Sequence, residues 1–162
     1  MKTATLSEIK AELREKSQPE LLTICLRIAR FRKENKELLN YILFESTNED
    51  NYVLAIKHEL ENEFKTVNTN SVYLAKKSIR RILRFMTKHI KYSDSRQTEV
   101  ELLIFFCQQM QKLNISIRDS KVLTNLYNRQ LLTMDKALKS MDEDLQFDYK
   151  ADLEKLNVVK YY

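Results

Sequence analysis

The sequence predicts an all-α protein, and three observations carry this prediction. Glycine is absent from the 162 residues and proline occurs once, although an average usage of about 7% would give roughly eleven glycines. Leucine, lysine, glutamate and arginine, which favour helices, are abundant. Apolar residues recur every three or four positions along most of the chain, which is the period of an amphipathic helix. We therefore expect helices throughout and no β-sheet.

Length and composition favour one all-helical domain over residues 1–162. A chain of this size buries enough surface to hold a core without a disulfide or a metal. Its residues are 43% hydrophobic and 31% charged, as in ordinary globular proteins and unlike disordered chains. The absence of glycine excludes the usual phosphate-binding loops, dinucleotide fingerprints and nucleophile elbows, because all of these need glycine.

Two capping boxes predict the first two helices. Thr5 and Glu8 have the spacing at which a hydroxyl and a carboxylate cap each other's backbone N–H. Ser17 and Glu20 repeat that spacing. The second helix runs to about Lys33, and apolar residues cover more than half of its circumference. We expect this helix to be central to the core.

Further helices follow, separated by polar turns. Residues 38–44, 51–65 and 71–92 keep the helical period, and residues 100–113 form a second candidate core helix. A long helix then ends near residue 141, and a last helix begins at three acidic residues, where the helix dipole favours negative charge. The core stripe expected for the long helix is Val122, Leu126, Leu131, Met134, Leu138 and Met141.

The elements add up to seven or eight mostly antiparallel helices. They form either a compact bundle or a short armadillo- or HEAT-like solenoid, because helix hairpins of 35–45 residues are typical of repeat arrays but no repeated signature accompanies them. The aromatic tail that ends in Tyr161 and Tyr162 either docks on the body or meets a partner.

One segment holds the whole basic excess of the chain. Residues 66–93 carry seven basic side chains and no acidic one, whereas the residues before and after each carry a net charge of −1. On a helix over residues 71–92, the apolar side chains gather on one side and the basic ones on the other. A concentrated patch of this kind attracts phosphates or acidic partners. The candidate binding surface, named here the basic face, consists of Tyr73, Lys76, Lys77, Arg80, Arg81, Arg84, Lys88 and Lys91.

Two interpretations of the basic face are open. It is a solvated face that Glu59, Glu61 and Glu63 on the preceding helix partly neutralise, which is the ordinary fate of helix charges. Alternatively, it is a binding surface whose charges stay unpaired.

The histidines do not predict a metal centre. His58 and Glu61 have the i,i+3 spacing of two ligands on one helix. A carboxylate-bridged di-metal bundle needs a glutamate three residues before a histidine on each of two helices. Ala55 precedes His58 at that distance, and Met86 precedes His89. We expect no metal, no cofactor and no catalytic residue.

The two cysteines, Cys25 and Cys107, are far apart, and both lie in apolar stretches. This predicts buried free thiols in a reducing compartment. The first residues have no apolar signal core, and the longest apolar run, residues 102–107, is too short to span a bilayer. We expect a cytoplasmic protein without a membrane partner.

Residues 6–45, LSEIKAELREKSQPELLTICLRIARFRKENKELLNYILFE, resemble the start of small helical bacterial proteins with no assigned activity. The general pattern also resembles armadillo- or HEAT-like helix pairs. The resemblance implies a helical repeat-like fold and a binding or scaffolding role, with no catalytic residues to carry over.

Three functions are compatible with these observations. The first is a non-catalytic protein-interaction or scaffold domain with an unidentified protein partner. The second is sequence-independent nucleic-acid binding, in which the helix over residues 71–92 contacts backbone phosphates. The third, which ranks last, is an enzyme of unrecognised type. A homodimer is also compatible, because several helices carry apolar residues on more than one side.

Overall fold

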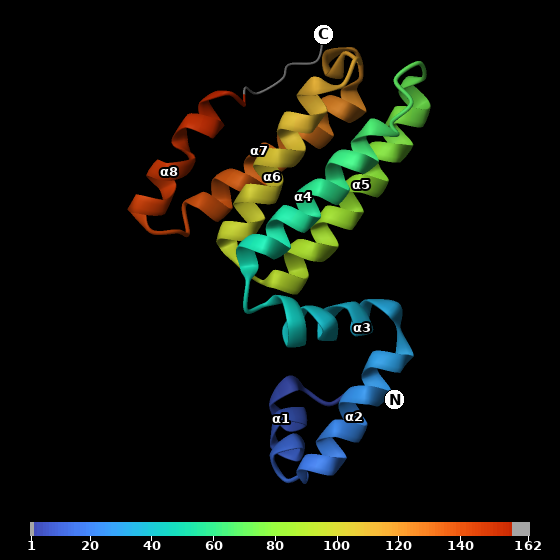
Figure 1. Ribbon diagram of the computed structural model, residues 1–162, viewed down its shortest axis with the longest axis vertical. Helices are drawn as coiled ribbons and strands as arrows, with labels where there is room; N and C mark the ends of the chain where they lie inside the picture. Colours follow the sequence, from blue (N-terminus) through green and yellow to red (C-terminus); the bar gives the residue numbers. More distant parts are fainter. Residues whose placement is uncertain (1, 157–162) are drawn as a thin grey trace. The chain divides into compact units, whose positions relative to one another are not determined.

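The structure is a computed structural model that describes residues 2–156. These residues form eight α-helices and contain no β-strand, so the all-α prediction and the expected number of helices are confirmed (Figure 1). Contacts divide the chain into two compact units, named here the N-terminal unit (residues 1–44) and the C-terminal unit (residues 45–162). One domain over residues 1–162 stays a prediction. Tyr161 and Tyr162 lie outside the described residues.

The N-terminal unit contains three helices, α1 (Leu6–Arg14), α2 (Gln18–Phe31) and α3 (Lys33–Asn40). A π-helical turn, η1 (Tyr41–Glu45), follows α3 and ends at the first residue of the C-terminal unit. Helices α2 and α3 pack against each other.

Both predicted capping boxes are present. The Glu8 carboxylate accepts hydrogen bonds from the backbone N–H of Thr5 at 2.7 Å and from its hydroxyl at 2.8 Å. The Glu20 carboxylate accepts from the hydroxyl of Ser17 at 2.6 Å and from its backbone N–H at 2.8 Å. Because these bonds favour the charged form, they hold the pKa of both carboxyls below its usual range.

One residue separates α2 from α3. Arg32 has an extended backbone, with φ −144° and ψ 149°, which breaks the helix. The side-chain amide of Asn35 donates to the carbonyl of Ile28 at 2.9 Å. That carbonyl is among the last four of α2, which have no partner within a helix. Asn35 therefore caps α2 and fixes the bend of the pair.

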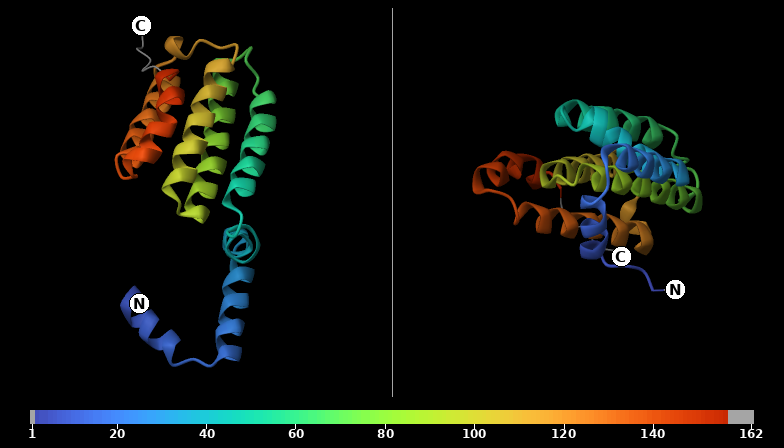
Figure 2. Two further views of the ribbon diagram at one scale, coloured as in Figure 1. Left: turned by 60° about the vertical axis from the view of Figure 1, so that its left-hand side comes forward. Right: turned by 90° about the horizontal axis from the view of Figure 1, so that it is seen from below.

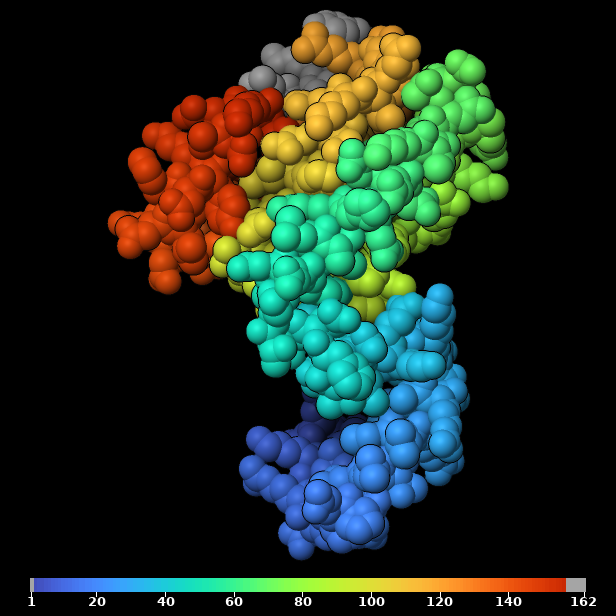
Figure 3. All heavy atoms as spheres, viewed as in Figure 1, coloured from blue at the N-terminus to red at the C-terminus, as the bar shows by residue number. Residues whose placement is uncertain are grey.

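The C-terminal unit contains α4 (Glu49–Lys65), α5 (Val72–Ser93), α6 (Arg96–Lys112), α7 (Lys121–Leu138) and α8 (Glu143–Glu154), with a 3₁₀ turn, η2 (Ile117–Asp119), before α7. Helices α4–α7 lie side by side, and consecutive helices run in opposite directions (Figures 1 and 2). Each of α4, α5 and α6 packs on the other two, and α7 packs on α6. The atoms of α4 and α5 touch along both helices (Figure 3). The unit is an antiparallel helical bundle.

Serine and aspartate cap helix ends in this chain, which has no glycine for that role. The hydroxyls of Ser71, Ser95 and Ser120 accept hydrogen bonds from the third helical N–H of α5, α6 and α7. Asp94 ends α5 in the left-handed conformation, with φ 53°. This C-terminal position usually takes glycine, and Asp is one of the few other residues that tolerate it.

Helix α6 lies at the centre of the bundle and is buried on most sides. This confirms the second candidate core helix. The Phe106 ring packs edge-on against Phe64 of α4, with the ring centroids 5.4 Å apart. The buried residues of α6 are Thr98, Val100, Leu102, Leu103, Ile104, Phe106, Cys107 and Met110.

A carboxylate joins three helices at one end of the bundle. Glu49, in the first turn of α4, accepts a hydrogen bond from Thr98 of α6 at 2.5 Å and another from Ser93 at the end of α5. Thr98 is 1% exposed. Hydrogen bonds to charged groups contribute about 1.5–3 kcal/mol each, so this network stabilises the alignment of α4, α5 and α6.

The predicted stripe of α7 is partly wrong. Val122 is exposed, and Leu126 and Leu131 are half-buried. Leu123 and Tyr127 take the fully buried positions instead, while Met134 and Leu138 are buried as expected. Thr124 is also buried, because its hydroxyl donates to the Ile117 carbonyl at 2.8 Å. The buried side of α7 therefore includes the polar residues Thr124 and Gln130, and it is rotated away from the predicted apolar stripe.

The prediction that the helix from Ser17 to about Lys33 is central to the core is wrong. Helix α2, which corresponds to it, has no buried residue. Its apolar side chains are half-buried or exposed, and Phe31 is 77% exposed.

We predict that Leu60→Ala lowers the free energy of unfolding of the bundle by about 2–5 kcal/mol, because it leaves a cavity at a site with 0% exposure. Leu54→Ala, on an exposed position of the same helix, is the matched control and should change stability by less than about 0.5 kcal/mol. Urea titration followed by circular dichroism measures both, and equal losses would contradict the position of the core.

Candidate functional site

The basic face lies on the solvent side of α5. Ala75, Ile79, Ile82 and Met86 anchor the opposite side of this helix in the core. Tyr73 is 73% exposed, and each basic side chain of the face is exposed or half-buried. The structure therefore places all eight predicted residues on one surface, and their role in binding stays a prediction.

Few of the charges on the basic face are neutralised. Arg81 pairs with Glu63 of α4 at 2.6 Å, which is the internal pairing foreseen from the sequence. Glu61 pairs instead with Lys65 at 3.4 Å, and Glu59 makes no ion pair with another described residue. Within residues 2–156, five cations of the basic face likewise make no ion pair. They are Lys76, Lys77, Arg80, Arg84 and Lys91.

An aromatic cluster lies where the basic face ends. The Lys88 ammonium lies 5.9 Å from the ring centroids of both Phe85 and Tyr92. Between these rings, His89 accepts or donates a hydrogen bond to the Tyr52 hydroxyl of α4 at 2.8 Å. The cluster packs the last turns of α5 against α4 and holds the Lys88 side chain over apolar surface.

The N-terminal unit presents a second candidate surface, named here the apolar surface, which includes residues of the α2 helix that the sequence predicts inside the core. Among residues 2–44, only Tyr41 is buried. Large apolar side chains are exposed along α1, α2, α3 and η1, and Phe44 is 70% exposed. The apolar surface consists of Leu6, Ile9, Leu13, Leu22, Leu26, Ile28, Phe31, Leu38, Ile42, Leu43 and Phe44.

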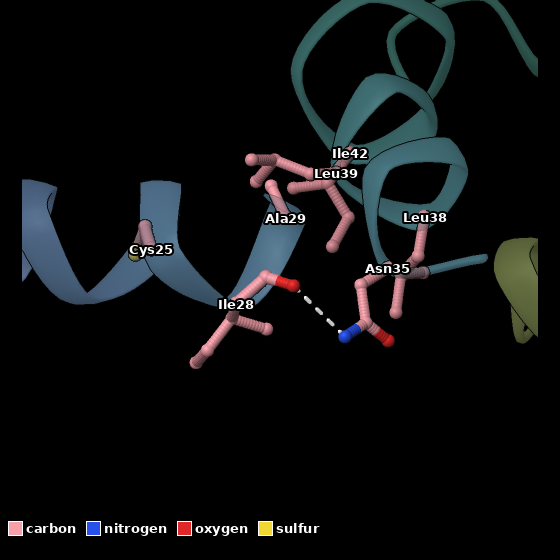
Figure 4. Close-up of a pocket in the computed structure, with 7 residues that line it drawn as sticks. All are labelled: Cys25, Ile28, Ala29, Asn35, Leu38, Leu39 and Ile42. Carbon is pink, nitrogen blue, oxygen red and sulfur yellow. Dashed lines mark hydrogen bonds between the residues drawn. The ribbon is translucent and has the colours of Figure 1, made fainter. Parts of the chain in front are cut away.

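A hollow opens between α2 and α3 (Figure 4). Ile28 and Ala29 of α2 face Leu38 and Leu39 of α3 across it, and the Asn35–Ile28 hydrogen bond bridges the two helices. Cys25 and Ile42 complete the lining. The predicted burial of Cys25 is wrong, since this free thiol is exposed.

A second hollow lies between the same helices and η1. Leu26, Leu39, Leu43 and Phe44 give it apolar walls. Arg30 and Lys36 also line it, and Asn40 adds a polar group. An apolar hollow with two cations suits an apolar segment that carries acidic residues beside it.

Helix α8 is fastened to the bundle by a polar contact. Glu101 of α6 pairs with Lys57 of α4 at 2.7 Å and accepts a hydrogen bond from the Tyr149 hydroxyl at 3.0 Å. Burial, together with the charge of Glu101, raises the pKa of Tyr149 to about 12. All three side chains line a small pocket, and each has a partner within it, so the contact has a sufficient structural role.

The groups that could perform chemistry are dispersed. Among residues 2–156, no cluster of three or more His, Cys, Asp or Glu side chains could hold a metal ion. His58 lies 3.4 Å from the Asn62 amide, and His89 belongs to the aromatic cluster. Burial raises the pKa of the Cys107 thiol to about 12, so this thiol stays protonated.

Comparisons with known proteins found no matching protein-family model, no matching curated protein and no matching solved structure. None of the helices in the described part of the chain is both long enough and apolar enough to cross a membrane.

We predict that Cys107 is inert toward a chromogenic disulfide reagent while the protein is folded, because the thiolate is the reactive species and burial suppresses it. The Cys25→Ser variant isolates this thiol. At about pH 8 it should react only after urea unfolds the bundle. Prompt reaction without urea would contradict the burial of α6.

Proposed function

We propose that this protein is a non-catalytic interaction domain that binds a partner protein through the apolar surface of its N-terminal unit. The observation that carries the proposal is the burial of a single side chain, Tyr41, among residues 2–44. Large exposed apolar patches are typical of protein–protein binding sites and rare on monomers.

The free energy of folding supports the same proposal. Ordering one residue costs about 1–2 kcal/mol of backbone entropy, which apolar burial must offset. Segments of roughly 40 residues usually need a disulfide, a metal or oligomerisation to remain folded. Cys25 and Cys107 are free, and the described residues hold no metal cluster. We propose that a protein cover over the apolar surface stabilises α1–α3 instead.

A second copy of the chain is the partner that these observations favour. The apolar surface must be covered whenever the N-terminal unit is folded. Another copy of the chain is available wherever the protein is present, so it can always supply this cover. The acidic residues that would complement Arg30 and Lys36 are available on the same unit, as Glu12, Glu15 and Glu34. We further propose a cytoplasmic location, because free cysteines persist in reducing compartments.

Sedimentation equilibrium over a wide range of protein concentration tests the proposal. We expect a dimer for the wild-type chain. The variant Leu26→Asp/Leu43→Asp places two carboxylates on walls of the second hollow and should weaken association by at least about 30-fold, the effect of one hot-spot residue.

The matched control is Leu54→Asp/Leu132→Asp. These two leucines, on α4 and α7, are 61% and 64% exposed and lie in the C-terminal unit. The control should associate like the wild-type chain. A monomer at every concentration whose N-terminal unit resists proteolysis would contradict the proposal, because that unit would then be stable without a cover. Equal weakening of self-association in both variants would also contradict it, because the added negative charge alone would then explain the loss.

A further inference from the structure

A stripe of cations runs the length of the basic face. Lys77, Arg80, Arg84, Lys88 and Lys91, named here the cationic stripe, fall within about 80° of the helix circumference at about 100° per residue. Lys77 and Lys91 are fourteen residues apart, so the stripe is about 21 Å long at about 1.5 Å per residue. The buried side of α5 fixes its position on the bundle.

Four of the five cations of the cationic stripe have no counter-charge among the described residues. Lys77, Arg80, Arg84 and Lys91 make no ion pair with any residue between 2 and 156, and Lys88 lies over two aromatic rings. Glu63 of α4 binds Arg81, which lies at the edge of the basic face and outside the stripe. Like charges four residues apart on a helix repel each other by a few tenths of a kcal/mol per pair. A bound polyanion would attract each cation and offset the repulsion between them.

We propose that the cationic stripe binds the phosphate backbone of double-stranded nucleic acid. A duplex presents phosphates at regular intervals along its axis, and the stripe presents cations at regular intervals of three or four residues on a rigid helix. Arg80 and Arg84 supply planar guanidinium groups, which bind phosphate oxygens in a bidentate manner. Contacts of this kind position a protein on a duplex without reading its sequence.

Other polyanions fit the stripe less well. A helix that lies on a membrane inserts its apolar face into the lipid, whereas Ala75, Ile79 and Met86 on that face of α5 are buried in the bundle. Single strands bind by stacking bases on exposed aromatic rings. Tyr73 is the one exposed ring on the described basic face, while Phe85 and Tyr92 beside the stripe are half-buried. An acidic protein offers carboxylates without the regular spacing of a backbone.

Fluorescence anisotropy with labelled DNA and RNA duplexes of mixed sequence tests this inference. If four phosphates are neutralised, the affinity of the wild-type chain should fall roughly 150-fold between about 50 and 200 mM salt. The variant Arg80→Glu/Arg84→Glu should lose most of the binding at the lower salt concentration. Its salt dependence should be shallower by about two counterions.

Arg129→Glu/Lys136→Glu is the matched control. Both side chains are exposed on α7, and the control has the same net charge as the stripe variant. It should bind duplex within a few-fold of the wild-type chain. Thermal melting of both variants verifies that the bundle is folded, and since all four side chains are exposed, both should melt near the wild-type temperature.

Four outcomes would overturn the inference. The first is no duplex binding at about 50 mM salt, and the second is equal loss in the stripe variant and its control. The third is tighter binding of polyglutamate than of either duplex, which would assign the stripe to an acidic protein. The fourth is tighter binding of phosphatidylserine vesicles, which would assign it to a membrane surface. The stripe and the apolar surface lie in different units, so the two proposals fail independently.

Discussion

The C-terminal unit depends on the burial of α6. This helix packs against α4, α5 and α7, and eight of its seventeen residues are buried. Its neighbours need only one apolar stripe each, which leaves their outer sides free to carry charge. The seven cations of α5 are tolerated because Ala75, Ile79, Ile82 and Met86 secure the helix from the other side. The cations of α5 lie outside the core, so the core does not have to bury their charge.

In the N-terminal unit, a helix rich in apolar residues stays exposed. Helix α2 is as rich in apolar residues as α6, and periodicity gave both helices the same interpretation. Yet α6 is enclosed by its own chain, whereas α2 packs on α3 and leaves Leu22, Ile28 and Phe31 exposed. An apolar circumference indicates that a helix will be covered. It does not indicate which molecule supplies the cover. For the same reason, the apolar stretch around Cys25 wrongly predicts a buried thiol.

Structural features that depend on residues close together in the sequence could be predicted. The two capping boxes, the turns and the α6 core follow from neighbouring residues and from apolar spacing. The eight residues of the basic face also share one surface, as their spacing requires. The pairing of Glu63, but not Glu59 or Glu61, with this face depends on how α4 and α5 are rotated against each other, which the sequence does not specify. The buried positions of α7 depend likewise on the backbone carbonyls that accept hydrogen bonds from the Thr124 hydroxyl and the Gln130 amide, because these bonds allow both polar side chains to be buried.

We propose that the two units are stabilised differently, the C-terminal unit by its own core and the N-terminal unit by a protein cover. Hydrogen exchange of the full chain at a low and a high protein concentration distinguishes the two. We expect α6 amides to exchange equally slowly at both concentrations, while protection of α2 amides rises with concentration. Slow α2 exchange that is independent of concentration and comparable to that of α6 would overturn this proposal, because the N-terminal unit would then be stable without a second copy.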